Sequence, residues 1–493
     1  MKVTIFSRVC CVLLMSSFFP FAVFANQDTN LRLQQRDDLS ARQTERAFIE
    51  EELNKEEEAA SITVNGQTYD VGNTLHELGQ ALHLAVQSRQ WFLAQDFLTR
   101  YQAIPGHDML LVHYAKGAIF RQDGQLTDAE LEYHALLESQ PNFLPGQLEL
   151  ARVLFDNQKN SDSLELFQRV DSALPADNPR AQGVRNTVES FVNALNHRDT
   201  WQGAFSFGPS FNDNLNQSSE SYTCLLRHAT GLCLMDRVTP EAESATGIDF
   251  DASLNKRFSL EGHHGISFRG LSYGSVYNNH TQFNEHTLIA SLGYSFHSAK
   301  NRFSFSPQVE YNASGNHALY VSAGLKADWV KNISAKSAFK FEGEVERQTY
   351  RPKALDYQSD WQWSSSMTYW HQVAKGWLLF GGVDWTKKEN DQNVHEYQLI
   401  GGRFGVNKSW DSGFDISLFS SLRERKYGGF SALLDAKRED KEQNHTLVVA
   451  AKKWSVYGFS PLLTWQHTQV SSNVDWLYSY QKNQYSIKLE KRF

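Results

Sequence analysis

The C-terminal part of the chain, residues 199–493, alternates between apolar and polar residues with a period of two in fourteen short segments. In one of these segments, Ile248 and Phe250 alternate with Asp249 and Asp251. Successive side chains of a β-strand point to opposite faces, so this spacing predicts strands with one apolar and one polar face. We therefore expect fourteen such strands in this part of the chain.

The aromatic residues of these segments favour a membrane barrel over a soluble β-sandwich, which would also alternate. Tryptophans recur near the ends of the segments, as they do in the girdles at the two membrane interfaces of an outer-membrane barrel. They are Trp361, Trp377, Trp385, Trp410, Trp454, Trp465 and Trp476. A hydrophobic content of 41% fits this fold, because only every second residue of a barrel strand must be apolar.

The final segment ends on Phe493, and one of its faces is formed by Tyr485, Ile487, Leu489 and Phe493. A terminal aromatic residue on a strand with this alternation is typical of the last strand of an outer-membrane barrel. We therefore assign closure of the barrel to these four residues. The expected fold is α plus transmembrane β, with a 14-stranded antiparallel barrel in the cell outer membrane.

The connections between the segments predict which way the barrel faces. Those after even-numbered segments are short, such as 298–301 and 411–413. Those after odd-numbered segments are often longer, at about 214–243, 350–359, 387–394 and 426–442. Outer-membrane barrels have short periplasmic turns and longer outer loops, so both ends of the chain are expected in the periplasm.

Residues 75–198 show a helical pattern that repeats, since Gly117 and Ala151 lie 34 positions apart. Four more pairs keep this spacing: Phe120 with Leu154, Ala129 with Ser163, Tyr133 with Phe167, and Pro141 with Pro175. Thirty-four residues is the tetratricopeptide period, in which small residues lie where paired helices touch. The pattern predicts a periplasmic solenoid of helix pairs with a concave face, preceded by a weaker repeat and followed by a capping helix.

The N-terminal residues predict export. Residues 1–25 have a positive start, an apolar stretch and a small-residue cleavage site, which is the pattern of a signal peptide. Residues 26–74 are predicted to form a charged arm that includes a small hairpin at 62–71, where Asn65-Gly66 suits a two-residue turn. An exported protein works without ATP, and a net charge of −8 is too modest to indicate a nucleic-acid partner.

Cys224 and Cys233 are the cysteines that remain once the signal peptide is removed, and both lie in the first long connection. An even pair in an exported chain predicts a disulfide. The alternative is a metal site with His228, but it lacks a fourth ligand and the usual spacing. We therefore expect no metal ion.

The sequence contains none of the nucleophile turns, phosphate-binding loops or zinc-binding helices that mark common enzymes, so we expect no catalytic residue, no cofactor and no enzymatic activity. Charged residues instead fall on the polar face of the predicted strands. They include Lys340, Glu342, Glu344 and Glu346 on one strand and Arg423 on another. They could support a hydrated lumen through ion-pair ladders, or they could form a surface along which a polypeptide slides.

Joined tetratricopeptide repeats and a fourteen-stranded barrel resemble the Slam family, the surface lipoprotein assembly modulators. The resemblance covers nearly the whole mature chain. Its most specific stretches are Ala103–Asp108, Tyr114–Ala118, Gln140–Gly146, Leu148–Phe155 and Leu489–Phe493.

This resemblance implies an outer-membrane translocon that delivers client proteins, either surface lipoproteins or soluble secreted proteins for haem and iron acquisition. The other implied partners are periplasmic chaperones, the barrel assembly machinery and outer-membrane lipid. The candidate client-binding residues on the solenoid are Tyr114, Phe120, Glu149 and Arg152, although Tyr114 and Phe120 also suit the core. The alternative function is a tetratricopeptide-barrel channel that exports an exopolysaccharide.

Overall fold

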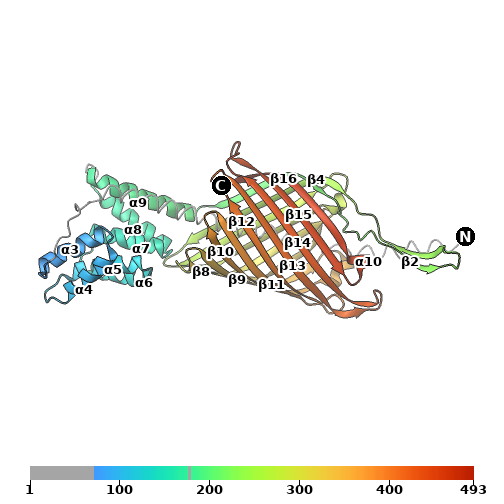
Figure 1. Cartoon of the computed structure of the whole chain (residues 1–493), viewed down its shortest axis with the longest axis horizontal. Helices are drawn as coiled ribbons and strands as arrows, with labels where there is room; N and C mark the ends of the chain where they lie inside the picture. Colours follow the sequence, from blue (N-terminus) through green and yellow to red (C-terminus); the bar gives the residue numbers. More distant parts are fainter. Residues whose placement is uncertain (1–71, 176–178) are drawn as a thin grey trace.

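The computed structural model of the chain describes residues 72–175 and 179–493. The expected signal peptide and the expected hairpin at 62–71 lie outside these residues. A domain of helices lies at one end of a closed barrel, and a two-stranded ribbon extends from the opposite end (Figure 1). The last helix of the domain ends at Arg198 and the first barrel strand begins at Gln202.

The helical domain consists of three helix pairs and a longer final helix. The helices are α3 (Leu75–Gln87), α4 (Trp91–Gln102), α5 (Met109–Gln122), α6 (Leu126–Ser139), α7 (Leu144–Asp156), α8 (Asn160–Ala173) and α9 (Pro179–Arg198). The pairs α5–α6 and α7–α8 contain the positions that repeat with the tetratricopeptide spacing. The predicted solenoid is therefore confirmed, and α9 covers its C-terminal end.

Small and large residues at repeating positions explain why the helices pair. A Cβ atom added at Gly117 in α5 would lie 2.7 Å from the ring of Tyr133 in α6, so only glycine allows this close packing. Tyr133 and its repeat partner Phe167 are both fully buried, as is Ser163. The hydroxyl of Ser163 donates a hydrogen bond of 2.9 Å to the carbonyl of Ala151, which satisfies it inside the core.

Fourteen antiparallel strands form the barrel, and β1 closes it by pairing with both β16 and β4. The strands are β1 (Gln202–Asn212), β4 (Ala245–Ser259), β5 (His264–Val276), β6 (Glu285–His297), β7 (Asn301–Ser314), β8 (His317–Ser334), β9 (Ser337–Tyr350), β10 (Asp360–Ala374), β11 (Trp377–Lys388), β12 (Tyr397–Ser409), β13 (Phe414–Ser431), β14 (Ala436–Ala451), β15 (Phe459–Ser472) and β16 (Tyr480–Arg492). Within the described parts of the chain, no helix has both the length and the apolar character needed to cross a membrane.

The alternation of residues places apolar side chains outside the barrel and polar ones inside. Ile248 is exposed, whereas its neighbour Asp249 is buried. At the closing strand, Tyr485, Ile487, Leu489 and Phe493 are all exposed on the outer face. The end of that strand is fixed by Phe493, whose backbone exchanges hydrogen bonds of 2.9 and 3.0 Å with Gly203 of β1.

The turns at the helical end of the barrel are mostly short, as predicted, but the expected outer loop at about 426–442 is wrong. Strand β13 continues to Ser431 and β14 begins at Ala436, so a four-position turn at 432–435 joins two of the longest strands. Charged residues occur on both faces of this hairpin, for example an outward pair between Lys426 and Glu424 at 3.0 Å. Because the segment is polar on both faces, its sequence predicts a loop, although its backbone continues the sheet.

The first long connection contains a second departure from the expected loops. It includes β2 (Tyr222–Arg227) and β3 (Cys233–Val238), which pair with each other and form a separate two-stranded sheet. A short helix, α10 (Asp475–Tyr478), lies in the connection between β15 and β16. These elements lie at the end of the barrel opposite the solenoid (Figure 1).

Candidate functional site

Three of the four candidate client-binding residues lie together on the solenoid. Arg152 Nη1 is 2.8 Å from Glu149 Oε1 within helix α7, and Arg121 Nη1 of α5 is 3.2 Å from Glu149 Oε2. Arg121 Nε is also 2.8 Å from Asp156 Oδ2. The charges of Glu149 and Arg152 both act on the pKa of Tyr114, which places its phenol near this pair. This cluster of charges connects two successive repeats.

Burial and neighbouring charges set the protonation of this cluster. Burial acts to raise the pKa of Glu149, but Arg152 and Arg121 outweigh it and lower the pKa. Burial, reinforced by the negative charge of Glu149, raises the pKa of Tyr114 to about 12. The carboxylate is therefore ionised and the phenol neutral at physiological pH.

The aromatic candidates also contribute to packing. The ring of Tyr114 lies edge-on to Tyr133 and to Phe143, with centroids 6.2 Å apart in each case. Phe120 is half-buried and packs against the core that includes Phe155 and Phe167. A role for these four residues in client binding remains a prediction.

Sequence reasoning missed two members of the cluster. Glu149, Arg152 and Asp156 are spaced i, i+3 and i+7, so a charged stripe on the otherwise apolar helix α7 was visible in the sequence. Arg121 comes from the preceding repeat. Its position opposite this stripe depends on how the helix pairs stack, which the spacing alone does not determine.

A hydrogen-bonded joint fixes the solenoid to the barrel. The carboxylate of Asp162, in the first turn of α8, accepts hydrogen bonds of 3.1 and 3.2 Å from the backbone N–H of Gly262, in the turn between β4 and β5. Ser259 at the end of β4 donates a hydrogen bond of 2.8 Å to Asp199, and the amide of Asn160 donates to the hydroxyl of Ser259 at 3.3 Å. The solenoid is thereby held at the mouth of the barrel.

Two arginines stabilise this joint from either side. The guanidinium of Arg198 lies 3.7 Å above the ring of Phe155 and donates hydrogen bonds to Asn160 at 2.9 Å and to the Phe155 carbonyl at 3.2 Å. Arg257 of β4 donates to the hydroxyl of Ser259 at 2.6 Å and to the carbonyl of His263 at 2.9 Å. These contacts tie α7, α8 and α9 to a barrel turn that is itself held in one conformation.

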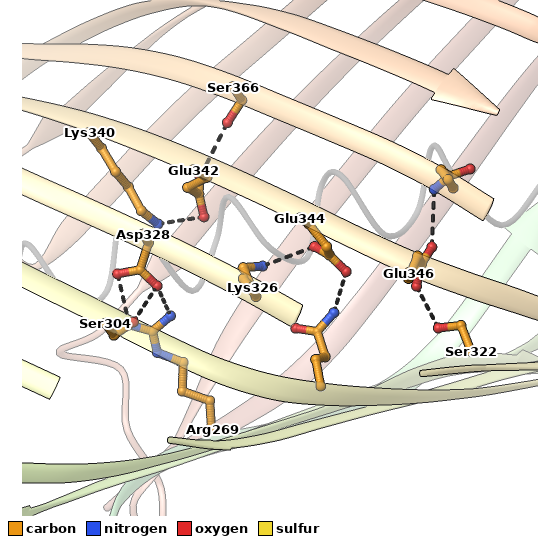
Figure 2. A network of polar contacts seen from close by, with 12 residues as sticks. Arg269, Ser304, Ser322, Lys326, Asp328, Lys340, Glu342, Glu344, Glu346 and Ser366 are labelled. Atoms are coloured by element: carbon orange, nitrogen blue, oxygen red, sulfur yellow. Dashed lines mark hydrogen bonds and ion pairs between the residues drawn. The ribbon is translucent and has the colours of Figure 1, made fainter. Parts of the chain in front are cut away.

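Ion pairs line one wall of the barrel lumen, as Figure 2 shows. Lys340 Nζ and Glu342 Oε1, both on β9, are 2.7 Å apart, and Lys326 of β8 lies 3.6 Å from Glu344 of β9. The hydroxyl of Ser322 donates to Glu346. The same network includes Arg269 of β5 and Asp328 of β8 at 2.6 Å, and Ser304 of β7 donates to this aspartate at 2.8 Å.

Strands β13 and β14 carry a second set of ion pairs. Glu442 of β14 lies 2.7 Å from Arg425 and 3.6 Å from Arg423, both on β13. Arg438 and Asp440 of β14 are 2.7 Å apart. The predicted ladder between lumen charges is therefore present. Its charges are paired with one another, so the lining of the lumen is polar at these positions.

Tyrosines gather inside the barrel near the end that carries the ribbon. Tyr320 of β8 and Tyr350 of β9 have ring centroids 5.4 Å apart, and those of Tyr397 of β12 and Tyr427 of β13 are 5.7 Å apart. All four rings are buried against neighbouring side chains. Their faces are therefore covered, unlike those of an aromatic ladder on which a sugar chain could stack.

Cys224 and Cys233 are joined by a disulfide, with their Cα atoms 5.8 Å apart. The disulfide links β2 to β3 in the ribbon. Nδ1 of His228 lies 2.9 Å from the hydroxyl of Thr230. Within residues 72–175 and 179–493, no group of histidine, cysteine, aspartate and glutamate side chains has an arrangement that could hold a metal ion.

Comparison with known proteins gives the same two-part division. The family model described as surface lipoprotein assembly modifier matches residues 201–493, and that of its N-terminal TPR repeats matches residues 66–167. The chain is 40% identical to the hemophilin secretion modulator of Acinetobacter baumannii, over 98% of this chain and 99% of that protein.

More distant relatives also match over most of both chains. The chain is 25% identical to surface lipoprotein assembly modifier 1 of Haemophilus influenzae, with 81% of each chain covered. It is also 25% identical to surface lipoprotein assembly modifier 1 of Neisseria meningitidis serogroup B, over 89% of this chain and 86% of that protein. The similarity therefore includes the helical domain as well as the barrel.

Proposed function

The chain belongs to the surface lipoprotein assembly modifier family, and on this basis we propose that it is an outer-membrane translocon that delivers specific client proteins from the periplasm to the cell surface or the medium. The barrel lies in the outer membrane, and the helical domain lies in the periplasm at its inner mouth. The observation that supports the proposal most directly is the joint between Asp162 and the β4–β5 turn, which holds the solenoid at that mouth.

The relative with 40% identity favours a secreted client over a lipid-anchored one. That protein is named a hemophilin secretion modulator, whereas the relatives at 25% identity are named for surface lipoproteins. We propose a client of the same kind as hemophilin, released into the medium. The names of the relatives give no support to the exopolysaccharide channel, and the covered tyrosine rings of the lumen do not suit a sugar path.

The solenoid provides the binding step in this scheme. A client held unfolded by periplasmic chaperones would contact the solenoid at the cluster that contains Tyr114, Glu149 and Arg152. No ATP is available in the periplasm to drive the transfer. Folding of the client outside the cell would therefore have to make the transfer irreversible. Insertion of the translocon itself would depend on the barrel assembly machinery and outer-membrane lipid.

The test is co-expression of the full chain, in a Gram-negative host that lacks this system, with each protein encoded beside its gene. Each such protein is then assayed in the medium, and on intact cells by its sensitivity to added protease. Release or surface exposure that requires the full chain supports a translocon. Absence of both, with the barrel shown to be folded in the outer membrane, would contradict it.

Two sets of variants separate the roles of the two domains. Deletion of residues 75–198 is expected to abolish client export and to leave the barrel inserted. Tyr114→Phe removes only the phenolic hydroxyl, and Arg152→Gln removes the charge, so both test the cluster with little loss of packing. Phe120→Leu is the matched change at a packing position. Normal export by the deletion variant would rule out the proposed role of the solenoid.

A further inference from the structure

The ribbon formed by β2 and β3 exposes an unusual amount of apolar surface. It carries six large apolar residues whose exposed fractions range from 50 to 66%. They are Tyr222, Leu225, Leu232, Leu234, Met235 and Val238. Soluble surfaces rarely keep such residues together unless they bind a partner. The ribbon continues along the barrel axis, beyond the end of the strands (Figure 1). It is thus directed away from the lipid-facing belt.

The base of this ribbon is attached to the outer end of the barrel seam. The hydroxyls of Ser219 and Ser221 donate to the carbonyl of Trp476, at 2.6 and 2.7 Å, and the guanidinium of Arg237 lies 3.7 Å above the Trp476 ring. The side chain of Asn214 donates to the carbonyl of Gln481, at the start of β16, at 2.9 Å. A chain that leaves the lumen or the seam at this end would pass the ribbon.

The ribbon is also built to keep its shape without a core. The disulfide between Cys224 and Cys233 links its two strands. Its sheet has only these two strands, so in the described parts of the chain no third strand pairs with either outer edge. An unpaired edge beside apolar side chains is the arrangement that binds extended polypeptides by strand addition.

We propose that the β2–β3 ribbon is a docking surface for the client polypeptide while it is still extended, as it leaves the barrel. Apolar side chains of the client would cover the ribbon's exposed leucines, and its backbone would pair with a free strand edge. Once the client folds, its apolar residues are buried and it dissociates. This inference rests on the proposed function, because that function brings an unfolded chain to this end of the barrel.

The test uses the full chain in lipid nanodiscs, with the photoreactive residue p-benzoylphenylalanine in place of Leu234. The probe is reduced, carboxymethylated α-lactalbumin, which cannot fold, and native α-lactalbumin is the control. We expect crosslinking to the unfolded probe at least tenfold above that to the native protein. A crosslink between two copies of the chain, or to lipopolysaccharide, in place of the unfolded probe would overturn the proposal.

A substituted ribbon provides the second measurement. Leu225→Ser, Leu232→Ser and Met235→Ser together are expected to lower crosslinking to the unfolded probe about tenfold. The matched control, Phe430→Ser with Leu433→Ser, removes two exposed apolar residues from the neighbouring β13–β14 hairpin and is expected to have no effect. Equal crosslinking in the ribbon variant and the unsubstituted protein would overturn the proposal.

This binding assay needs no transported client, so its result is independent of whether the translocon proposal holds. In cells that export a client, the same ribbon variant is expected to lower the yield of folded client several-fold while the barrel remains inserted. An unchanged yield would show that the ribbon is not needed for export and would contradict the proposed role. Loss of export in the solenoid deletion, with ribbon binding intact, would separate the two proposals.

Discussion

Lys488 on β16 forms an ion pair with Asp251 on β4, although β1 lies between these two strands. Gln484 of β16 makes a second bridge, donating a hydrogen bond of 2.8 Å to Asp249 of β4. Both bridges can cross β1 because its lumen face carries small residues. Strand β1 is therefore held by its backbone pairing with β16 and β4 and by the side chains that join these two neighbours across it.

Loss of the Lys488 bridge should weaken the seam. Lys488→Met leaves the Asp251 carboxylate without its cation in the lumen wall, which we expect to cost about 1–3 kcal/mol. The measurement is the temperature at which the folded barrel converts to the slower-migrating unfolded form in SDS electrophoresis. Lys437→Met, on the outer face near the hairpin tip, is the control. Combining Lys488→Met with Asp251→Leu should restore most of the loss, and no recovery would argue against a direct bridge.

The glycine next to this bridge should contribute to closure of the barrel. A Cβ atom at Gly208 of β1 would overlap the carbonyl oxygen of Ile487 and lie 2.8 Å from the Cα of Lys488. Gly208→Ala should therefore force β1 and β16 apart, at a cost of about 1–3 kcal/mol or more. Gly402→Ala is the matched change, because its nearest neighbour would be 3.9 Å away. Equal yields of folded barrel from the two variants would contradict this close contact.

The barrel and the repeats could be predicted because each depends on a local period. Alternation along a strand decides which residues face lipid, and the recurrence of small residues such as Gly117 and Ala151 decides where helices touch. The hairpin at β13–β14 was missed because its outer face carries Lys426 and Glu424 beyond the apolar belt. When both faces are polar, the alternation of apolar and polar residues that identifies a barrel strand is lost.

The joint between the domains could not be predicted from any local pattern. Asp162 and Gly262 lie 100 positions apart, and the glycine contributes only its backbone N–H. Any residue other than proline offers that donor, so the sequence does not single it out. The paired strands of the ribbon were hidden for a similar reason. Their apolar residues pack against no core, so the sequence predicts a long connection at 214–243 and no strands within it.

Acid should weaken the solenoid through Glu130. Burial acts to raise its pKa, but hydrogen bonds and charge from His134 and Lys159 lower the pKa to about 2. The carboxyl titrates near 4.3 when the chain is unfolded, so its contribution is complete above about pH 4.3 and disappears as the pH falls towards 2. With allowance for solvent screening, we expect the ionised Glu130 to contribute about 1–2 kcal/mol to the free energy of unfolding.

Lys159→Met tests whether Lys159 lowers the pKa of Glu130, because Lys159 Nζ lies 2.6 Å from Glu130 Oε1. Denaturation of the full chain, followed by helical circular dichroism at pH 7, 4.5 and 3, should show a variant that is less stable at pH 7. Its difference from the unsubstituted protein should shrink by pH 3. Arg169→Met breaks an exposed pair with Glu165 and should change little. A difference that stays constant with pH would contradict the proposed role of Glu130.

Release of the solenoid from the barrel should separate client binding from client transfer. Asp162→Ala together with Asp199→Ala removes the acceptors for the Gly262 backbone N–H and the Ser259 hydroxyl. Each lost hydrogen bond is worth about 1 kcal/mol, so protease cleavage at 199–201 in the purified protein should accelerate about tenfold or more. Neither aspartate belongs to the cluster around Glu149, so the solenoid should keep its affinity for a client.

Export should nevertheless fall in this variant, because a bound client would no longer be held at the mouth of the lumen. The measurement is the ratio of exported to periplasmic client in cells with equal amounts of folded barrel. Asp171→Ala is the control, since this half-exposed carboxylate contacts only Arg185 of the solenoid at 3.4 Å among the ion pairs of the described chain. Faster cleavage with unchanged export would show that the solenoid acts without a fixed position. Unchanged cleavage would show that other contacts suffice to hold the joint.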